Sequence, residues 1–395
     1  MPHLFDATNV ITAVLIIAVA GAGAALVREM RNKQMHLWLG SYIGRSKRPK
    51  SNGTTHILFC FVDHFEPMWL NPPYEQEVER VRRWTEEYPR LARNHRDADG
   101  CHPKHTFFYP EEEYRQEHLD AIASLCSSGF GELEIHLHHD NDTEQGVREK
   151  LSRFTRLLQE RHGAMSRFPD SGKPAWGFIH GNWALDNSLA DGSQCGVNNE
   201  LIVLKEEGCY ADFTLPSAPS SAQTRKINSI YYAKDDPKAP KSHDDGRDVT
   251  VGGKPWGDLM IIQGPLMLNW KNRKWGVLPR IENGDIRSVY PPTPERVDLW
   301  VEAGIHVKGR PEWVFVKVYT HGTQERDMEC LLGEPVDRMF SYLEQRYNDG
   351  HDYQLHYVTA REMYNIAKAA EAGNSGNPND YRDFILPPPA NCMTT

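Results

Sequence analysis

The segment Gly131-Glu-Leu-Glu-Ile-His-Leu-His-His-Asp140 alternates polar with apolar residues, a pattern typical of a β-strand with one face in the core. Successive side chains of a strand point to opposite faces of the sheet. One face therefore carries Leu133, Ile135 and Leu137, and the other carries Glu132, Glu134, His136, His138 and Asp140. The segment predicts a strand that brings imidazoles and carboxylates together where it ends.

Imidazoles beside a carboxylate have the ligand chemistry of zinc or a similar divalent ion. In α/β proteins such sites are built at the carboxyl ends of strands. Three histidines and one aspartate lie within residues 136–140, which favours a metal site. The alternative is a cluster of ordinary surface histidines at a strand end.

A second strand ends in residues of the same kind, in His56-Ile-Leu-Phe-Cys-Phe-Val-Asp-His-Phe-Glu-Pro67. Residues 57–62 are apolar throughout, as in a parallel strand that is buried on both faces. Asp63, His64 and Glu66 follow at once. Taken alone, they also fit a turn whose acidic residues cap the next helix. Two strands that end in ligand-type residues together favour one shared site.

The bulk composition limits the class of protein. With 395 residues and 39% hydrophobic content, the chain is long enough for one large α/β domain with insertions or for two smaller domains. Its net charge of −9 argues against a nucleic-acid partner. The seven cysteines are scattered and contain no C-x-x-C pair, which indicates reduced thiols rather than a disulfide scaffold or a thiolate zinc site.

The N-terminal region predicts a membrane anchor. Residues 10–27 are apolar and uncharged over 18 positions, just long enough for a transmembrane helix. A cleaved signal peptide is the competing interpretation, because Ala18-Val-Ala20 resembles a cleavage site. However, the preceding residues include Asp6 and no Lys or Arg, unlike a secretory leader. We therefore expect an uncleaved anchor in residues 1–30, followed by a basic juxtamembrane linker in residues 31–55.

Basic residues follow the apolar segment, at Arg28, Arg31, Lys33, Arg45, Lys47, Arg48 and Lys50. The positive-inside rule then places the large C-terminal part in the cytoplasm, and the basic linker would lie against anionic headgroups. We expect a single-pass membrane protein; a periplasmic or extracellular location of the globular part stays open as the alternative.

The globular part alternates predicted strands with predicted helices. Strands are expected at 57–62, 105–109, 133–137, 175–180, 211–214, 313–319 and 354–358. Helices are expected at 74–92, 111–126, from 142 onward, 199–207, 336–347, and from a capping box of Thr359 and Glu362 toward Ala370. This order predicts a parallel sheet, either open or closed into a barrel.

Two segments depart from the alternating pattern. Residues 217–300 are rich in loops with strand-like pieces at 259–262 and 266–270, and predict an insertion over the active face, as a lid or as a structural elaboration. The tail at 372–395 is expected to be flexible. The core domain would then span residues 56–371.

These residues resemble the polysaccharide deacetylases of the carbohydrate esterase family four type, over most of 57–367. The resemblance implies a distorted (β/α) barrel of about seven strands. The family's first motif, a strand that ends in two aspartates, corresponds to Asp63 and His64. Its second motif, two metal-binding histidines, corresponds to His136 and Asp140. Its third motif corresponds to Phe178-Ile-His180-Gly-Asn-Trp183, followed by an acidic strand at Asp212, and its last motif corresponds to His321.

The departures from the family pattern are reciprocal. His64 stands where the family has an aspartate, and Asp140 stands where it has a histidine, so the set of one carboxylate and two imidazoles is preserved. A second alignment makes Asp63 the ligand beside His136 and His138, which leaves Val62 in the position of the base. His180 replaces the arginine of the third motif.

The resemblance implies a membrane-anchored, metal-dependent hydrolase that removes N- or O-acetyl groups from a polysaccharide or a lipid-linked sugar. Asp63 would be the catalytic base and His321 the acid. A divalent metal, expected to be zinc, would be held by His64, His136, Asp140 and His138. Substrate contacts are expected from His180, Asn182, Trp183, Asp212 and Glu66.

Two alternatives remain at this stage. The fold can be retained without the chemistry, which would give a binding or scaffold protein with partners in polysaccharide assembly. A metal site of His and Asp also supports hydrolysis of another bond, such as a phosphoester or a glycosidic linkage. No Gly-rich phosphate loop, serine nucleophile elbow or dinucleotide fingerprint is present in the sequence.

Overall fold

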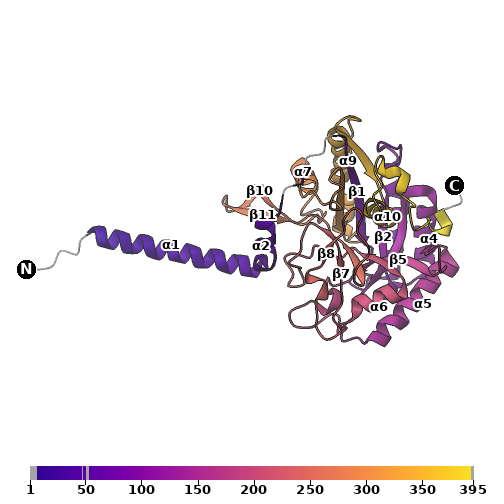
Figure 1. Cartoon of the computed structure of the whole chain (residues 1–395), viewed down its shortest axis with the longest axis horizontal. Helices are drawn as coiled ribbons and strands as arrows, with labels where there is room; N and C mark the ends of the chain where they lie inside the picture. The colour runs from indigo at the N-terminus through magenta and orange to yellow at the C-terminus, as the bar shows by residue number, and fades with distance from the viewer. Residues whose placement is uncertain (1–6, 47, 50–52, 393–395) are drawn as a thin grey trace, which may run out of the picture.

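The computed structural model describes residues 7–46, 48–49 and 53–392. It shows an α/β body from which helix α1 (Ala7–Asn32) extends as a long rod, with the shorter α2 (Met35–Gly44) at its base (Figure 1). The anchor predicted in residues 1–30 begins in residues 1–6, which lie outside the described part of the chain; among the described residues, no helix combines the length and the apolar character needed to cross a membrane.

The body is built on an eleven-stranded, mostly parallel sheet in the described residues. Its main path runs β12 (Trp313–Thr320), β1 (Thr55–His64), β2 (His105–Pro110), β3 (Gly131–Leu137), β5 (Pro174–His180), β6 (Cys209–Asp212), β9 (Leu259–Ile262), β7 (Ile230–Ala233) and β8 (Arg247–Asp248). β13 (Tyr353–Tyr357) pairs with the first half of β1, and β4 (Ser166–Arg167) pairs with β5.

The strand predictions are largely confirmed. Six of the seven expected strands coincide with β1, β2, β3, β5, β12 and β13 to within a few residues, and the expected strand at 211–214 begins and ends two residues earlier, as β6. All ten residues of β1 are buried, as expected for a parallel strand with both faces covered.

The predicted closed barrel does not form in the described strands. No ladder joins β12 at one end of the main path to β8 at the other, so the sheet is open. The Lys317 side chain of β12 reaches the segment that follows β6, where its Nζ donates hydrogen bonds to the carbonyl oxygens of Phe213 and Leu215. This side chain links β12 to a segment that follows a strand from the middle of the sheet's main path.

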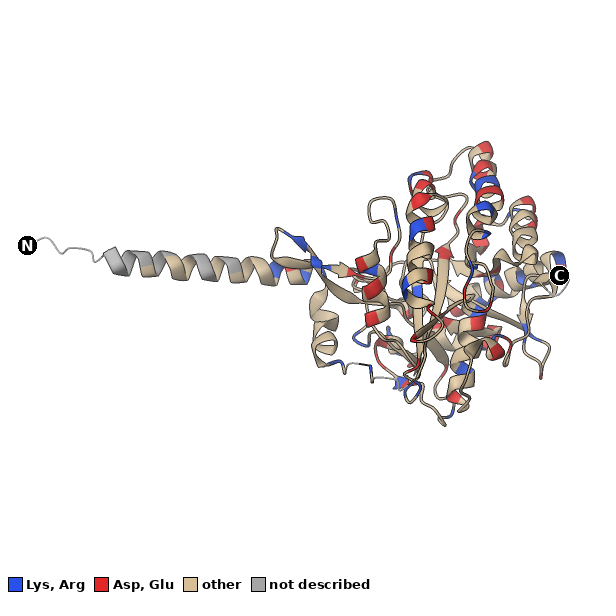
Figure 2. Cartoon of the chain, turned by 90° about the horizontal axis from the view of Figure 1, so that it is seen from above, with Lys and Arg blue, Asp and Glu red and all other residues tan. Residues whose placement is uncertain are grey.

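Helices cover the sheet on both faces. One face packs against α3 (Tyr74–Ala92), α4 (Gln116–Leu125), α5 (Glu144–His162), α6 (Glu200–Glu207), α7 (Pro294–Glu302), α8 (Glu325–Leu331) and α9 (Glu334–Tyr347). The other face packs against α10 (Ala360–Glu371), which is buried along its whole length and begins with the predicted capping box. The expected helix at 111–126 is instead a short 3₁₀ turn, Glu111–Glu113, followed by α4. Acidic and basic residues are interspersed along the outer helices (Figure 2).

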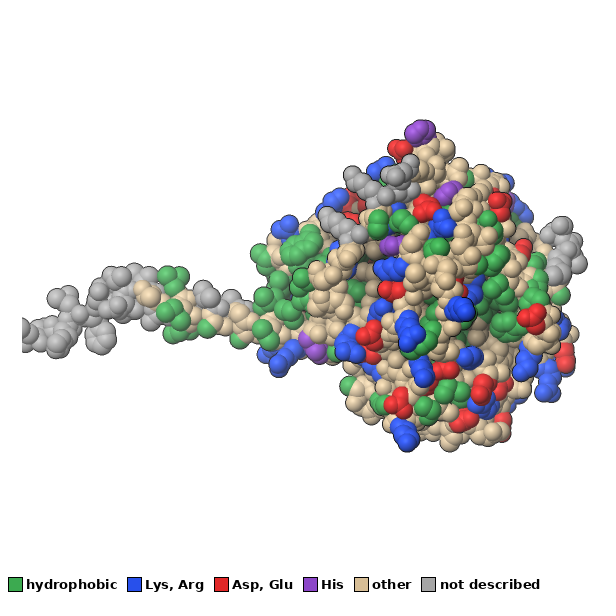
Figure 3. Space-filling view, in the orientation of Figure 1, with side chains coloured by type: hydrophobic (Ala, Val, Ile, Leu, Met, Phe, Trp, Pro, Cys, Tyr) green, Lys and Arg blue, Asp and Glu red, His purple; other side chains and the backbone are tan. Residues whose placement is uncertain are grey.

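The segment 217–300 contributes more to the sheet than an overlying insertion would. It supplies β7, β8 and β9 to the main sheet and forms a separate hairpin of β10 (Met267–Lys274) and β11 (Leu278–Glu282). The hairpin lies beside α1 and α2, where Lys274 Nζ is 2.8 Å from Glu29 Oε1 and Trp38 packs on Leu268. Hydrophobic side chains gather at the surface on this side of the body (Figure 3).

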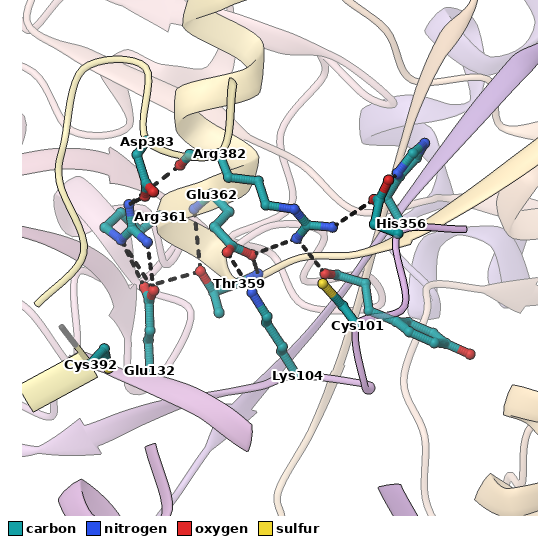
Figure 4. A network of polar contacts seen from close by, with 12 residues as sticks. Cys101, Lys104, Glu132, His356, Thr359, Arg361, Glu362, Arg382, Asp383 and Cys392 are labelled. Atoms are coloured by element: carbon teal, nitrogen blue, oxygen red, sulfur yellow. Dashed lines mark hydrogen bonds and ion pairs between the residues drawn. The ribbon is translucent and has the colours of Figure 1, made fainter. Parts of the chain in front are cut away.

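The C-terminal segment is packed, which differs from the predicted flexible tail. Leu386 is fully buried, and Asn365 Nδ2 donates to its carbonyl oxygen at 2.8 Å. Figure 4 shows the polar network that holds this segment. Arg361 contacts Glu132 Oε1 at 2.7 Å and Asp383 Oδ1 at 2.6 Å, so α10 is tied both to β3 and to the C-terminal segment.

Candidate metal centre

Five polar side chains meet at the carboxyl end of the parallel strands. His64 is the last residue of β1, Glu66 lies two residues beyond it, and His321 directly follows β12. His136 and His138 lie at the end of β3, on the other side of β2. Because β1 and β12 are neighbours and only β2 separates β1 from β3, three strand ends deliver their side chains to one place.

The Glu66 carboxylate is the centre of this group. Its Oε1 lies 3.2 Å from Nε2 of both His136 and His138, and its Oε2 lies 3.3 Å from Nδ1 of His321. The ligand atoms of Glu66, His136 and His138 all lie within 4.8 Å of one another, and the same holds for His64, Glu66 and His321. The donor set of one carboxylate and four imidazoles fits a divalent transition metal.

Two of the imidazoles are held in the orientation that a metal ligand needs. His136 Nδ1 donates to the carbonyl oxygen of Ile179 at 2.8 Å, and His138 Nδ1 pairs with the carboxylate of Glu112. Each ring therefore presents Nε2 to Glu66. A carbonyl or carboxylate on the far nitrogen of a histidine is the usual support of a metal ligand, because it fixes the tautomer and raises the basicity of the ring.

His64 completes the group from the end of β1. Its ring stacks on His321, with centroids 4.5 Å apart, and meets His136 edge-on at 4.8 Å. Its Nδ1 is buried and has no hydrogen-bond partner among the described residues. A buried nitrogen without a partner is costly, and a bound cation would satisfy it.

The electrostatics of the group favour a bound cation. Burial opposes the ionised form of Glu66, but the hydrogen bonds from His136, His138 and His321 outweigh it and hold the pKa of Glu66 well below its usual value. Burial, with the charge of neighbouring imidazoles, lowers the pKa of His64 well below its usual value. For His138, burial is outweighed by Glu112 and Glu66, which raise its pKa to about 10. An ionised carboxylate thus faces rings that compete for protons, and a metal ion can replace those protons.

Asp63, the predicted catalytic base, lies outside this group. Its side chain is fully buried on the opposite face of β1, where Oδ2 accepts a hydrogen bond from His105 Nε2 at 2.8 Å and Oδ1 accepts one from the Gly322 amide at 2.6 Å. Adjacent residues of a strand point to opposite faces, so Asp63 and His64 do not share a site. Asp63 instead fixes the backbone directly after His321.

Asp140, a predicted metal ligand, is also outside the group. It is exposed, and its Oδ1 accepts a hydrogen bond from the Gln194 amide at 2.6 Å. The strand ends at Leu137, so the alternation that would align Asp140 with His136 and His138 no longer holds at residue 140. Glu66, predicted as a substrate contact, takes the carboxylate position at the centre of the group.

Of the other predicted substrate contacts, Trp183 borders the Glu66 group, whereas Asp212 and His180 lie elsewhere. The Trp183 ring is half-buried and lies 5.9 Å from the rings of both His64 and His321, so it does border the group. Its φ of 57° is rare for a bulky residue, and such backbone outliers often mark functional sites. Asp212 is fully buried and bonds Thr214 Oγ1 at 2.6 Å, and His180 points to a different cluster. The Asn182 amide contacts His180 Nδ1 at 3.3 Å.

The structure adds residues that the sequence reasoning missed. Glu112 supports His138, His105 supports Asp63, and a further buried group contains His139, Cys195 and Glu200. The only sequence signal was for His139, which neighbours His138 and must point away from it if the strand pattern continues. Glu112, Cys195 and Glu200 come from a 3₁₀ turn, a loop and a helix start, where no periodicity marks them, and His105 begins β2.

Gly181 gives a direct test of how His138 is placed. A Cβ at this position would lie 2.2 Å from His138 Cδ2. We expect Gly181→Ala to displace the ring and weaken metal binding at the Glu66 group by about 10- to 100-fold, the usual loss when the support of a ligand is disturbed. Gly40→Ala, where the new methyl meets no atom within 4 Å, is the matched control. Competition with a metal-sensitive dye measures both, and equal affinities would show that the ring position does not matter.

Comparisons with known proteins give no family for this chain. No family model matches the sequence, and no curated protein matches it. The deacetylase resemblance therefore depends on the short motifs alone, and two of their predicted residues, Asp63 and Asp140, lie outside the metal group.

Proposed function

We propose that this chain is a metal-dependent hydrolase that removes acetyl groups from a carbohydrate. The observation that carries the proposal is the contact of Glu66 with three imidazole nitrogens at 3.2–3.3 Å at the carboxyl end of a parallel sheet. Ligands at this edge of an α/β sheet are typical of catalytic centres. The choice of acetyl groups and of a sugar follows from the resemblance in the strand-end motifs.

Glu66, His136 and His138 would hold the metal, expected to be zinc, with His64 and His321 beside them. When bound, such an ion lowers the pKa of a water molecule toward neutrality and polarises a carbonyl oxygen. With three protein ligands, a fourth coordination position would stay open for water or substrate, whereas a structural zinc site has four protein ligands.

The remaining residues have separate tasks in this proposal. Burial lowers the pKa of the His321 imidazole, but contact with Glu66 outweighs burial and raises it. This ring would donate the proton to the leaving group. The His321 side chain is 16% exposed and that of His138 is 30% exposed, which gives access from solvent. Trp183 offers a flat face for a sugar ring. Asp63 acts by holding the Gly322 amide and so the backbone beside His321.

A second candidate follows from the burial of Asp63. The family's base has no counterpart in contact with the metal group, so a protein that binds metal and carbohydrate without hydrolysis is the alternative. Its partners would be other components of a polysaccharide assembly system. Membrane attachment belongs to both candidates only as a proposal from the sequence.

The test measures acetate released by the zinc-loaded full-length chain from N-acetylated chitooligosaccharide and from an O-acetylated polysaccharide. We expect release by the wild type and its loss in His136→Ala. Phosphate and reducing-sugar assays on matched substrates would detect another bond. Bound zinc with no product from any substrate would reject the hydrolase and support the binding protein.

A further inference from the structure

A second group of metal-ligand side chains lies on the other face of the sheet. His139 follows β3, His180 ends β5, Cys195 lies in the loop before α6, and Glu200 begins α6. All four residues are buried, with at most 5% of their surface exposed, and their ligand atoms lie within 4.8 Å of one another. The neighbouring residues His138 and His139 thus point to two different groups.

Two of the three separations from Glu200 match a tetrahedral site, and the third is shorter. Glu200 Oε1 is 2.9 Å from His139 Nε2 and 3.8 Å from His180 Nε2, and Glu200 Oε2 is 3.6 Å from Cys195 Sγ. Zinc bonds of 2.0–2.3 Å at tetrahedral angles place ligand atoms about 3.3–3.8 Å apart. Small side-chain shifts would bring all four atoms to an ion between them.

The ligand atoms are also oriented for an ion. The Asp186 amide donates to Glu200 Oε2 at 2.6 Å, which turns Oε1 toward the two histidines. Asp142 Oδ2 lies 3.6 Å from His139 Nδ1, on the side away from Glu200. His180 Nε2 is buried and has no hydrogen-bond partner in the described residues. His180 can bind an ion through Nε2 only in the tautomer that carries its proton on Nδ1. That tautomer gives up one hydrogen bond, the 3.3 Å contact in which Nδ1 accepts from the backbone amide of Asn182.

The charges of the four side chains also suit a divalent cation. Cys195 and Glu200 are fully buried and in contact, so ionising both side chains places two negative charges together away from water. One thiolate, one carboxylate and two neutral imidazoles carry two negative charges, which a divalent ion would balance. Burial without such balance is costly.

We propose that His139, His180, Cys195 and Glu200 bind a structural zinc ion. The site is distinct from the Glu66 group: it has four protein ligands, contains a thiolate and has no exposed member. It would fix the loops that follow β3 and β5 to the start of α6. The sequence gives no C-x-x-C signal for it, because it uses a single cysteine. The inference does not depend on the hydrolase proposal.

Cobalt substitution tests the site in the full-length chain. We expect cobalt-loaded protein to show a thiolate-to-cobalt charge-transfer band with tetrahedral visible absorption. Cys195→Ser should lose the band and one equivalent of bound metal per chain, measured by elemental analysis. Cys209→Ser is the matched control, because Cys209 is also buried and lies outside the group. Glu66→Gln should keep the band, which separates this site from the first.

Two results would overturn the proposal. One is a wild-type spectrum with no thiolate band after reduction and reloading with cobalt, a result that needs no variant to fold. The other is a band that persists in Cys195→Ser. Loss of the band in Cys195→Ser with retention in both Cys209→Ser and Glu66→Gln supports it.

Discussion

Glu66→Gln should remove one divalent ion per chain, whereas Asp63→Asn should retain the metal content of the wild type. The amide removes the negative charge on which three imidazoles converge at 3.2–3.3 Å. Loss of a residue that only supports a ligand weakens metal binding by about 10- to 100-fold, so loss of the central carboxylate should exceed that range. Elemental analysis after dialysis gives the stoichiometry, and dye competition gives the affinity.

Asp63→Asn is the matched partner of this variant, because it makes the same change of acid to amide three residues away. Asp63 bonds His105 and the Gly322 amide on the other face of β1, so its loss should lower the unfolding temperature without removing metal. If Asp63→Asn lost the metal and Glu66→Gln kept it, Asp63 would be the metal ligand, as in the second alignment with the family. That result would reject the metal site centred on Glu66.

This pair of variants also shows where sequence reasoning stopped. The strand at 57–62 and the polar residues after it were predicted correctly, because a run of buried apolar residues has a clear signature. Alternation requires Asp63 and His64 to face opposite sides, but it does not say which side holds the site. The motif resemblance assigned Asp63 as the base and His64 as a metal ligand. The structure places His64 beside Glu66, His136 and His321, and Asp63 on the opposite face of β1.

The same limit applies at the end of β3. Alternation correctly placed His136 and His138 together, and it failed at Asp140 because the strand ends at Leu137. Glu112, Cys195 and Glu200 reach the two groups from a 3₁₀ turn, a loop and a helix start. Contacts of this kind depend on the tertiary fold, and no local pattern in the sequence reports them.

The open sheet and the packed C-terminal segment have similar explanations. β7 and β9 are four residues each, and β8 is two, within a segment rich in turn residues, so their pairing with the main sheet was hidden. The composition of residues 372–395 suggested flexibility, but Arg361 and Asn365 of α10 bind the backbone and side chains of this segment. Contacts with α10, and not the composition of the segment itself, therefore determine that the segment is packed.

Arg361→Ala should cause the largest loss of stability. The guanidinium is 2% exposed and bonds Glu132, Asp383 and the Leu386 carbonyl oxygen. Removing it leaves the buried Glu132 carboxylate with a hydrogen bond from Thr359 but without its cation. Breaking a buried ion pair in this way costs about 3–5 kcal/mol of unfolding free energy. Urea unfolding followed by circular dichroism measures the loss.

Arg338→Ala is the control, because the Arg338–Glu334 pair on α9 is 70% exposed on both sides and should contribute far less. Arg361→Met separates charge from packing, since it keeps most of the side-chain volume and removes the donors. If the lost ion pair dominates, Arg361→Met should be nearly as unstable as Arg361→Ala. Equal stability of Arg361→Ala and Arg338→Ala would show that the network in Figure 4 does not hold the C-terminal segment in place. The expected difference arises because water screens one pair and is excluded from the other.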